Sequence, residues 1–92
     1  MRITVKYMAQ LRQAAGVAGE TIVIASPSSA ADLLQKLAAQ RGDAFRRIIL
    51  TEAGRVQPAL LLFVGDEQIR GDVPHDFRDG DVVTILAPMA GG

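Results

Sequence analysis

Few residues in this sequence could take part in chemistry, and the C-terminal carboxylate of Gly92 stands out among them. Gly91 precedes it, and two residues without a Cβ let an extended backbone pass through a narrow channel. The carbonyl of Gly92 is also unshielded, so a nucleophile can reach it. The sequence has no cysteine and one histidine, His75, which excludes disulfides, zinc–thiolate sites and a cysteine nucleophile. We therefore do not interpret the chain as an enzyme, and catalytic groups acting at Gly92 would belong to a partner.

Asp79 and Asp81 are two carboxylates on either side of Gly80. Carboxylates beside a glycine hydrogen-bond within a turn far more often than they bind a metal or transfer protons. We therefore predict a turn at this position and no metal site.

Composition narrows the class of protein further. The 92 residues suffice for one domain, and 49% of them are hydrophobic, which is enough for one core. Ten basic residues balance ten acidic ones, whereas a nucleic-acid-binding protein usually has a basic excess. No apolar stretch approaches the roughly 20 residues that span a bilayer, and the first residues do not resemble a leader peptide. We expect a cytoplasmic protein that binds neither nucleic acid nor membrane.

Hydrophobic periodicity predicts the secondary structure. Ile3, Val5 and Tyr7 alternate with polar residues, which indicates a half-buried strand. Ser29 and Asp32 fit a capping box, which begins an amphipathic helix that ends at a left-handed cap on Gly42. The other predicted elements are a short helical stretch at 9–15, strands at 20–25, 59–64, 67–70 and 82–86, and a mixed segment at 43–57 with a turn at 51–54.

Two strands before a helix and further strands after it predict an α+β fold. The first strand should lie centrally beside the last, in parallel, in a mixed β-grasp (ubiquitin-like) sheet with one main helix on one face. We expect residues 1–86 to form this domain and residues 87–92 to form a flexible tail that ends in Gly-Gly.

Two apolar residues are expected on the outer face of this sheet. If Ile3, Val5 and Tyr7 face the helix, Met8 faces outward, and the alternation of the last strand places Leu86 outward as well. Because the two strands should be neighbours, Met8 and Leu86 could form one exposed apolar patch near the tail, and such a patch often binds a partner.

Several segments of the chain resemble the MoaD/ThiS family of ubiquitin-like sulfur carriers. They are Ile3-Thr4-Val5, Leu11-Arg12 with Gly16, Phe77-x-Asp79-Gly80-Asp81-x-Val83, and the terminal Gly91-Gly92. The resemblance extends from Met1 to Gly92 and is most specific in the aspartate–glycine–aspartate turn, the strand after it and the Gly-Gly end.

This resemblance implies a function for the tail. An E1-like adenylating enzyme would use ATP to adenylate Gly92, and sulfur would then convert the acyl-adenylate to a thiocarboxylate. Ala90 and Gly91 would lie in the enzyme's channel, and Met8 and Leu86 would bind its surface. A third position of the family's binding patch corresponds to Gln68, which is polar here. The resemblance implies no permanently bound cofactor, since ATP is used by the partner.

Several functions fit this resemblance. The chain could be the small subunit of molybdopterin synthase, giving sulfur to the large subunit, or a carrier for a cysteine synthase type of enzyme. A thiamine-pathway carrier fits less well, because such carriers tend to be shorter between the helix and the third strand. A ubiquitin-like modifier conjugated through Gly92 uses the same activation chemistry, and a β-grasp binding module without a carrier role is a third class.

Overall fold

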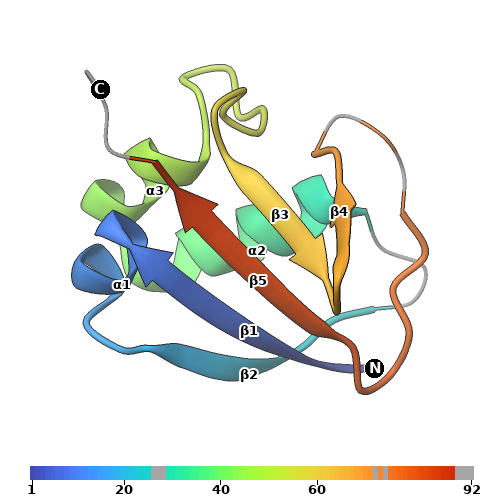
Figure 1. Cartoon of the computed structure of the whole chain (residues 1–92). Coiled ribbons are helices and arrows are strands. Elements are labelled where there is room, and N and C mark those ends of the chain that lie inside the picture. The colour runs from blue at the N-terminus through green and yellow to red at the C-terminus, as the bar shows by residue number, and fades with distance from the viewer. Residues whose placement is uncertain (26–28, 72, 74, 89–92) are drawn as a thin grey trace.

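The first strand, β1 (Arg2–Ala9), lies between two neighbours in a mixed five-stranded sheet. The computed structural model describes residues 1–25, 29–71, 73 and 75–88 (Figure 1). The sheet has the order β2-β1-β5-β3-β4, in which the other strands are β2 (Gly19–Val23), β3 (Leu61–Val64), β4 (Glu67–Ile69) and β5 (Val82–Ala87).

The central position of β1 and its parallel pairing with the last strand agree with the prediction. β1 pairs with β5 in parallel and with β2 in antiparallel, and β3 pairs antiparallel with both β5 and β4. β4 has three residues, one fewer than the predicted strand, and forms an edge of the sheet. With the main helix on one face of this sheet, the predicted α+β β-grasp fold is confirmed.

The main helix, α2 (Ala30–Arg41), begins with the predicted capping box. The Asp32 backbone N–H donates to the Ser29 hydroxyl at 3.2 Å, and the Ser29 N–H donates to the Asp32 carboxylate at 3.0 Å. Gly42 ends the helix with φ 93° but ψ −176°, so the predicted left-handed cap is wrong in detail. The positive φ still requires glycine, and the extended ψ turns the chain directly into another helix.

Two short helices complete the layer structure. α1 (Gln10–Ala15) follows β1 directly, one residue later than predicted, because Ala9 still belongs to the strand. α3 (Asp43–Ile49) lies in the segment 43–57, for which the sequence pattern predicts no helix or strand. It has no side-chain cap, and burial of Phe45 and Ile49 stabilises it.

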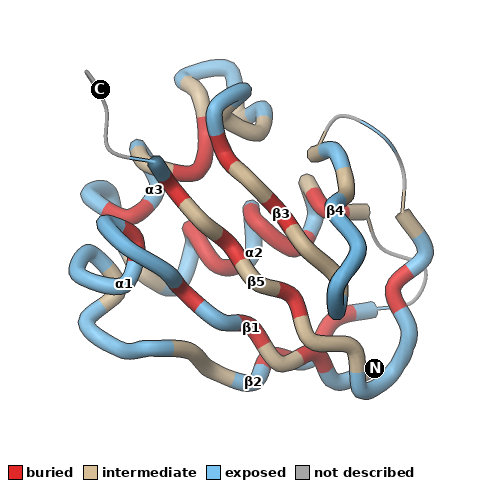
Figure 2. Tube along the Cα trace, viewed as in Figure 1, coloured by how far each residue is buried: buried red, intermediate tan, exposed pale blue. Residues whose placement is uncertain are grey.

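The core lies between one face of the sheet and the helices α2 and α3 (Figures 1 and 2). Inward-facing strand residues alternate with exposed or half-buried ones along β1 and β5. β5 extends one residue beyond the predicted strand, and Ala87 is buried in the core. The residues that are fully buried include Ile3, Val5, Tyr7, Leu33, Leu34, Leu37, Phe45, Leu62, Val83 and Ile85.

None of the helices in the described part of the chain is long and apolar enough to cross a membrane.

Candidate functional site

The Asp79-Gly80-Asp81 turn fixes how β5 lies against β1. The Asp79 carboxylate accepts a hydrogen bond from the Arg2 backbone N–H at 2.7 Å, and the Gly80 N–H donates to the Arg2 carbonyl at 2.8 Å. The Asp81 carboxylate accepts from the Arg78 N–H at 2.8 Å, which closes the turn on itself, and Gly80 has φ 90°. The turn predicted from the sequence is therefore confirmed, and it sets the register of the two central strands.

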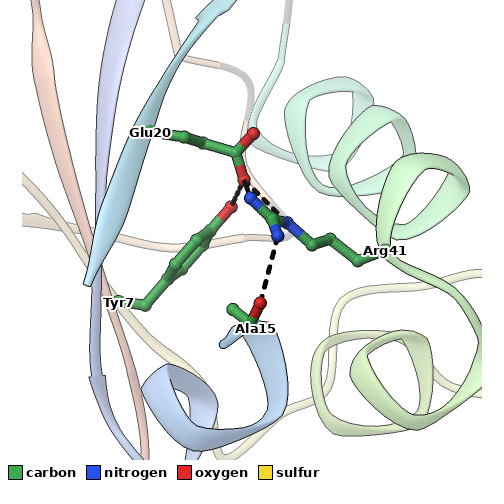
Figure 3. A network of polar contacts seen from close by, with 4 residues as sticks. All are labelled: Tyr7, Ala15, Glu20 and Arg41. Carbon is green, nitrogen blue, oxygen red and sulfur yellow. Dashed lines mark hydrogen bonds and ion pairs between the residues drawn. The ribbon is translucent and has the colours of Figure 1, made fainter. Parts of the chain in front are cut away.

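Tyr7 fixes which face of β1 points inward. Its ring is 1% exposed and packs edge-to-face on Phe45, with 5.4 Å between the ring centroids. Its hydroxyl donates to the Glu20 carboxylate, and Arg41 donates to the same oxygen through Nε at 2.9 Å and Nη2 at 2.6 Å (Figure 3). Arg41 Nη1 also donates to the Ala15 carbonyl at 3.0 Å. The network thus joins β1, β2, α1 and α2 at one point.

The same surroundings control the protonation of Tyr7. Burial first, and then the hydrogen bond to Glu20, raise the pKa of Tyr7 well above its ordinary range. The hydroxyl therefore keeps its proton to a higher pH than an ordinary tyrosine and remains a donor to Glu20.

Met8 and Leu86 lie directly opposite one another in the β1–β5 register. Because Tyr7 and Ile85 point into the core, Met8 and Leu86 point to the outer face of the sheet. The Met8 side chain is 47% exposed, and Leu86 is half-buried. The predicted placement of these two residues, side by side on the outer face, is therefore confirmed.

β3 adds two apolar residues to this face that the sequence analysis did not single out. Leu61 lies opposite Leu86, and Phe63 lies opposite Thr84, while Leu62 between them is buried. We call Met8, Leu61, Phe63 and Leu86 the outer patch. The run from Ala59 to Val64 has no polar alternation, which indicates a central strand but does not show which of its residues face outward.

Gln68 lies on β4 opposite Phe63 and is exposed. It therefore borders the outer patch at the edge of the sheet, where it adds a polar side chain and no apolar area. No described element covers this face of the sheet, which is the face toward the viewer in Figure 1.

The chain leaves the sheet beside the outer patch. Ala9 and Ala87 are the last paired residues of β1 and β5, one position beyond Met8 and Leu86, and Pro88 is exposed. The predicted tail residues Ala90, Gly91 and Gly92 lie outside the described residues. The described geometry therefore places the start of the tail and the outer patch at the same end of the two central strands.

A family model decides the identity of the chain. The model of the ThiS family matches residues 5–92, which is nearly the whole sequence. The chain belongs to the ThiS family. No curated protein sequence matches it significantly.

Solved structures support the fold of this ThiS-family protein. SAMP1 from Haloferax volcanii superposes with a TM-score of 0.86 over 100% of both chains, at 17% identity, which shows the fold alone. A putative molybdopterin converting factor, subunit 1, from Pyrococcus furiosus is 26% identical, with a TM-score of 0.74 over 97% of this chain and 99% of the other. The Amycolatopsis orientalis BexX/CysO complex contains a chain that is 25% identical, with a TM-score of 0.66 over 98% of this chain and 99% of that one.

These findings establish the broad class of this ThiS-family protein. It is a small carrier protein of the ThiS family, and it is not an enzyme. Among the residues that the structure describes, no group of three histidine, aspartate or glutamate side chains is arranged to hold a metal ion. His75 is half-buried, and its ring centroid lies 5.0 Å from that of the buried Phe77. The two rings therefore pack against each other in the loop that precedes the Asp79-Gly80-Asp81 turn.

Proposed function

We propose that this chain carries sulfur on the carboxylate of Gly92. An E1-like adenylating enzyme joins AMP from ATP to that carboxylate and releases pyrophosphate. A sulfur nucleophile then displaces AMP and leaves a thiocarboxylate, from which an acceptor enzyme takes the sulfur. The observation that carries the proposal is the family match, which extends through the terminal Gly91-Gly92 to residue 92.

The outer patch is the surface that we assign to the adenylating enzyme. Met8 and Leu86 form its centre, and Leu61 extends it along the same row of paired residues. Apolar side chains at the centre of an interface contribute most of its affinity. A partner bound there would meet the tail where it leaves β5, so Ala90 and Gly91 could enter the partner's channel and bring Gly92 to ATP.

The acceptor that we favour is a biosynthetic synthase. The similarity to a putative molybdopterin converting factor subunit supports the large subunit of molybdopterin synthase as the acceptor. The similarity to the BexX/CysO complex supports a sulfur-accepting enzyme of another pathway, such as a cysteine synthase type. ATP belongs to the adenylating partner in either case, and the carrier itself binds no permanent cofactor.

Reconstitution with the adenylating enzyme of the same genome tests the proposal. We expect the purified chain to support ATP–pyrophosphate exchange and, after sulfide is added, to gain about 16 Da as sulfur replaces oxygen. The thiocarboxylate should then lose that mass to one of the two candidate synthases. Exchange followed by stable adducts on lysines of other proteins, with no transfer to either synthase, would identify a modifier. A chain that never supports exchange would contradict both functions.

A further inference from the structure

The outer face of the sheet has an unbalanced charge distribution. The strand registers place two basic side chains, Arg2 and Lys6, on this face. Among the described strand residues no acidic side chain shares the face. Glu20 lies opposite Val5 and Glu67 opposite Val64, so both carboxylates belong to the helix side of the sheet.

The two cations differ in their surroundings. Arg2 lies at the end of β1 beside Asp79, whose carboxylate accepts from its backbone N–H. Lys6 lies in the middle of the strand, is exposed, and has no carboxylate within ion-pair distance in the described part of the chain. Its neighbour on β2 is Gly19, where a Cβ would lie 2.4 Å from the Val5 carbonyl oxygen, so no side chain can cover Lys6 from that side.

Lys6 also borders the outer patch closely. It precedes Met8 by two residues on the same face, a separation of about 6.6 Å along the strand. Across the sheet it lies opposite Thr84, which lies opposite Phe63, so Phe63 is two strand spacings of about 4.8 Å away. A protein that covers Met8 and Leu86 therefore also covers Lys6, or it places the edge of its interface against Lys6.

This position determines the chemistry of a partner that fits. An ammonium group that is removed from water without a counter-ion is strongly unfavourable, whereas a carboxylate opposite it makes the contact favourable and selective. A second copy of this chain fits less well, because two outer faces brought together would oppose cations, and no described strand residue of this face supplies a carboxylate to Lys6.

We propose that Lys6 determines partner specificity, by selecting an adenylating enzyme that places a carboxylate opposite it at the edge of the outer patch. This inference rests on the proposed carrier function. The carboxylate forms an ion pair with the Lys6 ammonium while Met8 and Leu86 bind the apolar part of the enzyme surface. Lys6 is a positioning residue for the adenylation reaction and does not contact the reacting atoms.

Kinetics of ATP–pyrophosphate exchange test this proposal, with the concentration of carrier varied against the adenylating enzyme of the same genome. We expect Lys6→Glu to raise the KM for the carrier about tenfold and Lys6→Gln about threefold, with kcat unchanged. High salt should reduce the difference between wild type and Lys6→Glu. Arg55→Glu is the matched control, because Arg55 is exposed and lies beside Gln35 and Ala31 of α2 on the helix side of the sheet. It makes the same change in net charge, and its KM should stay within about twofold of wild type.

A zero-length carbodiimide cross-link supplies an independent measurement. The chain has two lysines, and the second, Lys36, donates to the Val23 carbonyl from α2. We expect the cross-link to join Lys6 to an aspartate or glutamate of the adenylating enzyme, and a lysine at that enzyme position should restore the KM of Lys6→Glu. An unchanged KM for Lys6→Glu while wild type supports exchange would overturn the role of Lys6 and leave the carrier function standing. A change in self-association without a change in KM would identify a second copy as the occupant and would also overturn the proposal.

Discussion

The two faces of the sheet are built from the same strands, but their surroundings differ. The inner face is closed, with side chains such as Val5, Ile85 and Leu62 at 0–1% exposure against the helices. No described element covers the outer face, which combines an apolar patch with a cation, Lys6, that has no ion-pair partner among the described residues. Packing explains the apolar residues of the inner face, whereas Met8, Lys6 and Leu86 take no part in the core. The difference separates residues that maintain the fold from residues available to a partner.

The largest expected effect is a difference in the free energy of unfolding between variants of two adjacent residues of β5. Ile85 is completely buried and Leu86 is half-buried on the opposite face. We expect Ile85→Ala to lower the free energy of unfolding by about 3 kcal/mol, because it leaves a cavity in the core. Leu86→Ala should lower it by less than about 1 kcal/mol. Urea unfolding followed by circular dichroism measures both, and equal losses would show that the two faces are not distinct.

A charged side chain on the outer patch should weaken binding to the partner and leave the fold intact. We expect Met8→Asp and Leu86→Asp to stay folded but to bind the adenylating enzyme more weakly by about 2 kcal/mol, roughly 30-fold in Kd, because an interface anchor is lost and a charge is buried without a partner. Isothermal titration measures this affinity.

Thr21→Asp is the matched control for these variants, because Thr21 is exposed on the same face but lies opposite Thr4, away from the outer patch. It should leave the affinity nearly unchanged. If Met8→Asp binds with wild-type affinity, the outer patch is not the surface that binds the adenylating enzyme.

Tyr7 allows a smaller test that is confined to the inner face. Its folded pKa is raised above the unfolded value of about 10, so the stability that it contributes is complete below that pH. As the pH rises above about 10, the unfolded chain loses a proton that the folded chain keeps, and the free energy of unfolding should fall by up to about 1.4 kcal/mol per pH unit.

Tyr7→Phe keeps the ring and removes the titrating hydroxyl. The free energy of unfolding of this variant should depend less on pH between about 9 and 11 than that of wild type. Identical slopes for the two proteins would show that Glu20 and burial do not hold the Tyr7 proton.

The sequence predicted the features that depend on local patterns. The alternation of Ile3, Val5 and Tyr7 fixed the face of β1, and Ser29 with Asp32 fixed the start of α2. Short-range chemistry sets such features, so it is visible in one sequence.

Features that depend on tertiary contacts could not be predicted in the same way. α3 has only seven residues and no side-chain cap, so burial of Phe45 and Ile49 stabilises it rather than its own sequence. Leu61 and Phe63 point outward because of the way β3 pairs within the sheet, and they face solvent because no described element covers this face. The network of Tyr7, Glu20 and Arg41 requires three separate elements to meet, and no spacing in the sequence indicates it.

Deletion of Gly92 tests the central claim most directly, because it moves the carboxylate back by about 3.5 Å and near-attack chemistry does not tolerate that displacement. The free energy of unfolding should not change, because the described core is complete at Ala87. Gly91→Val is the companion variant, which keeps the length of the chain but adds a β-branched side chain where the channel should admit none. ATP–pyrophosphate exchange followed by sulfide and intact-mass measurement should show a gain of about 16 Da for wild type and neither exchange nor gain for the deletion. A Gly92 deletion that still supports exchange and gains this mass would show that the activated carboxylate is not at Gly92.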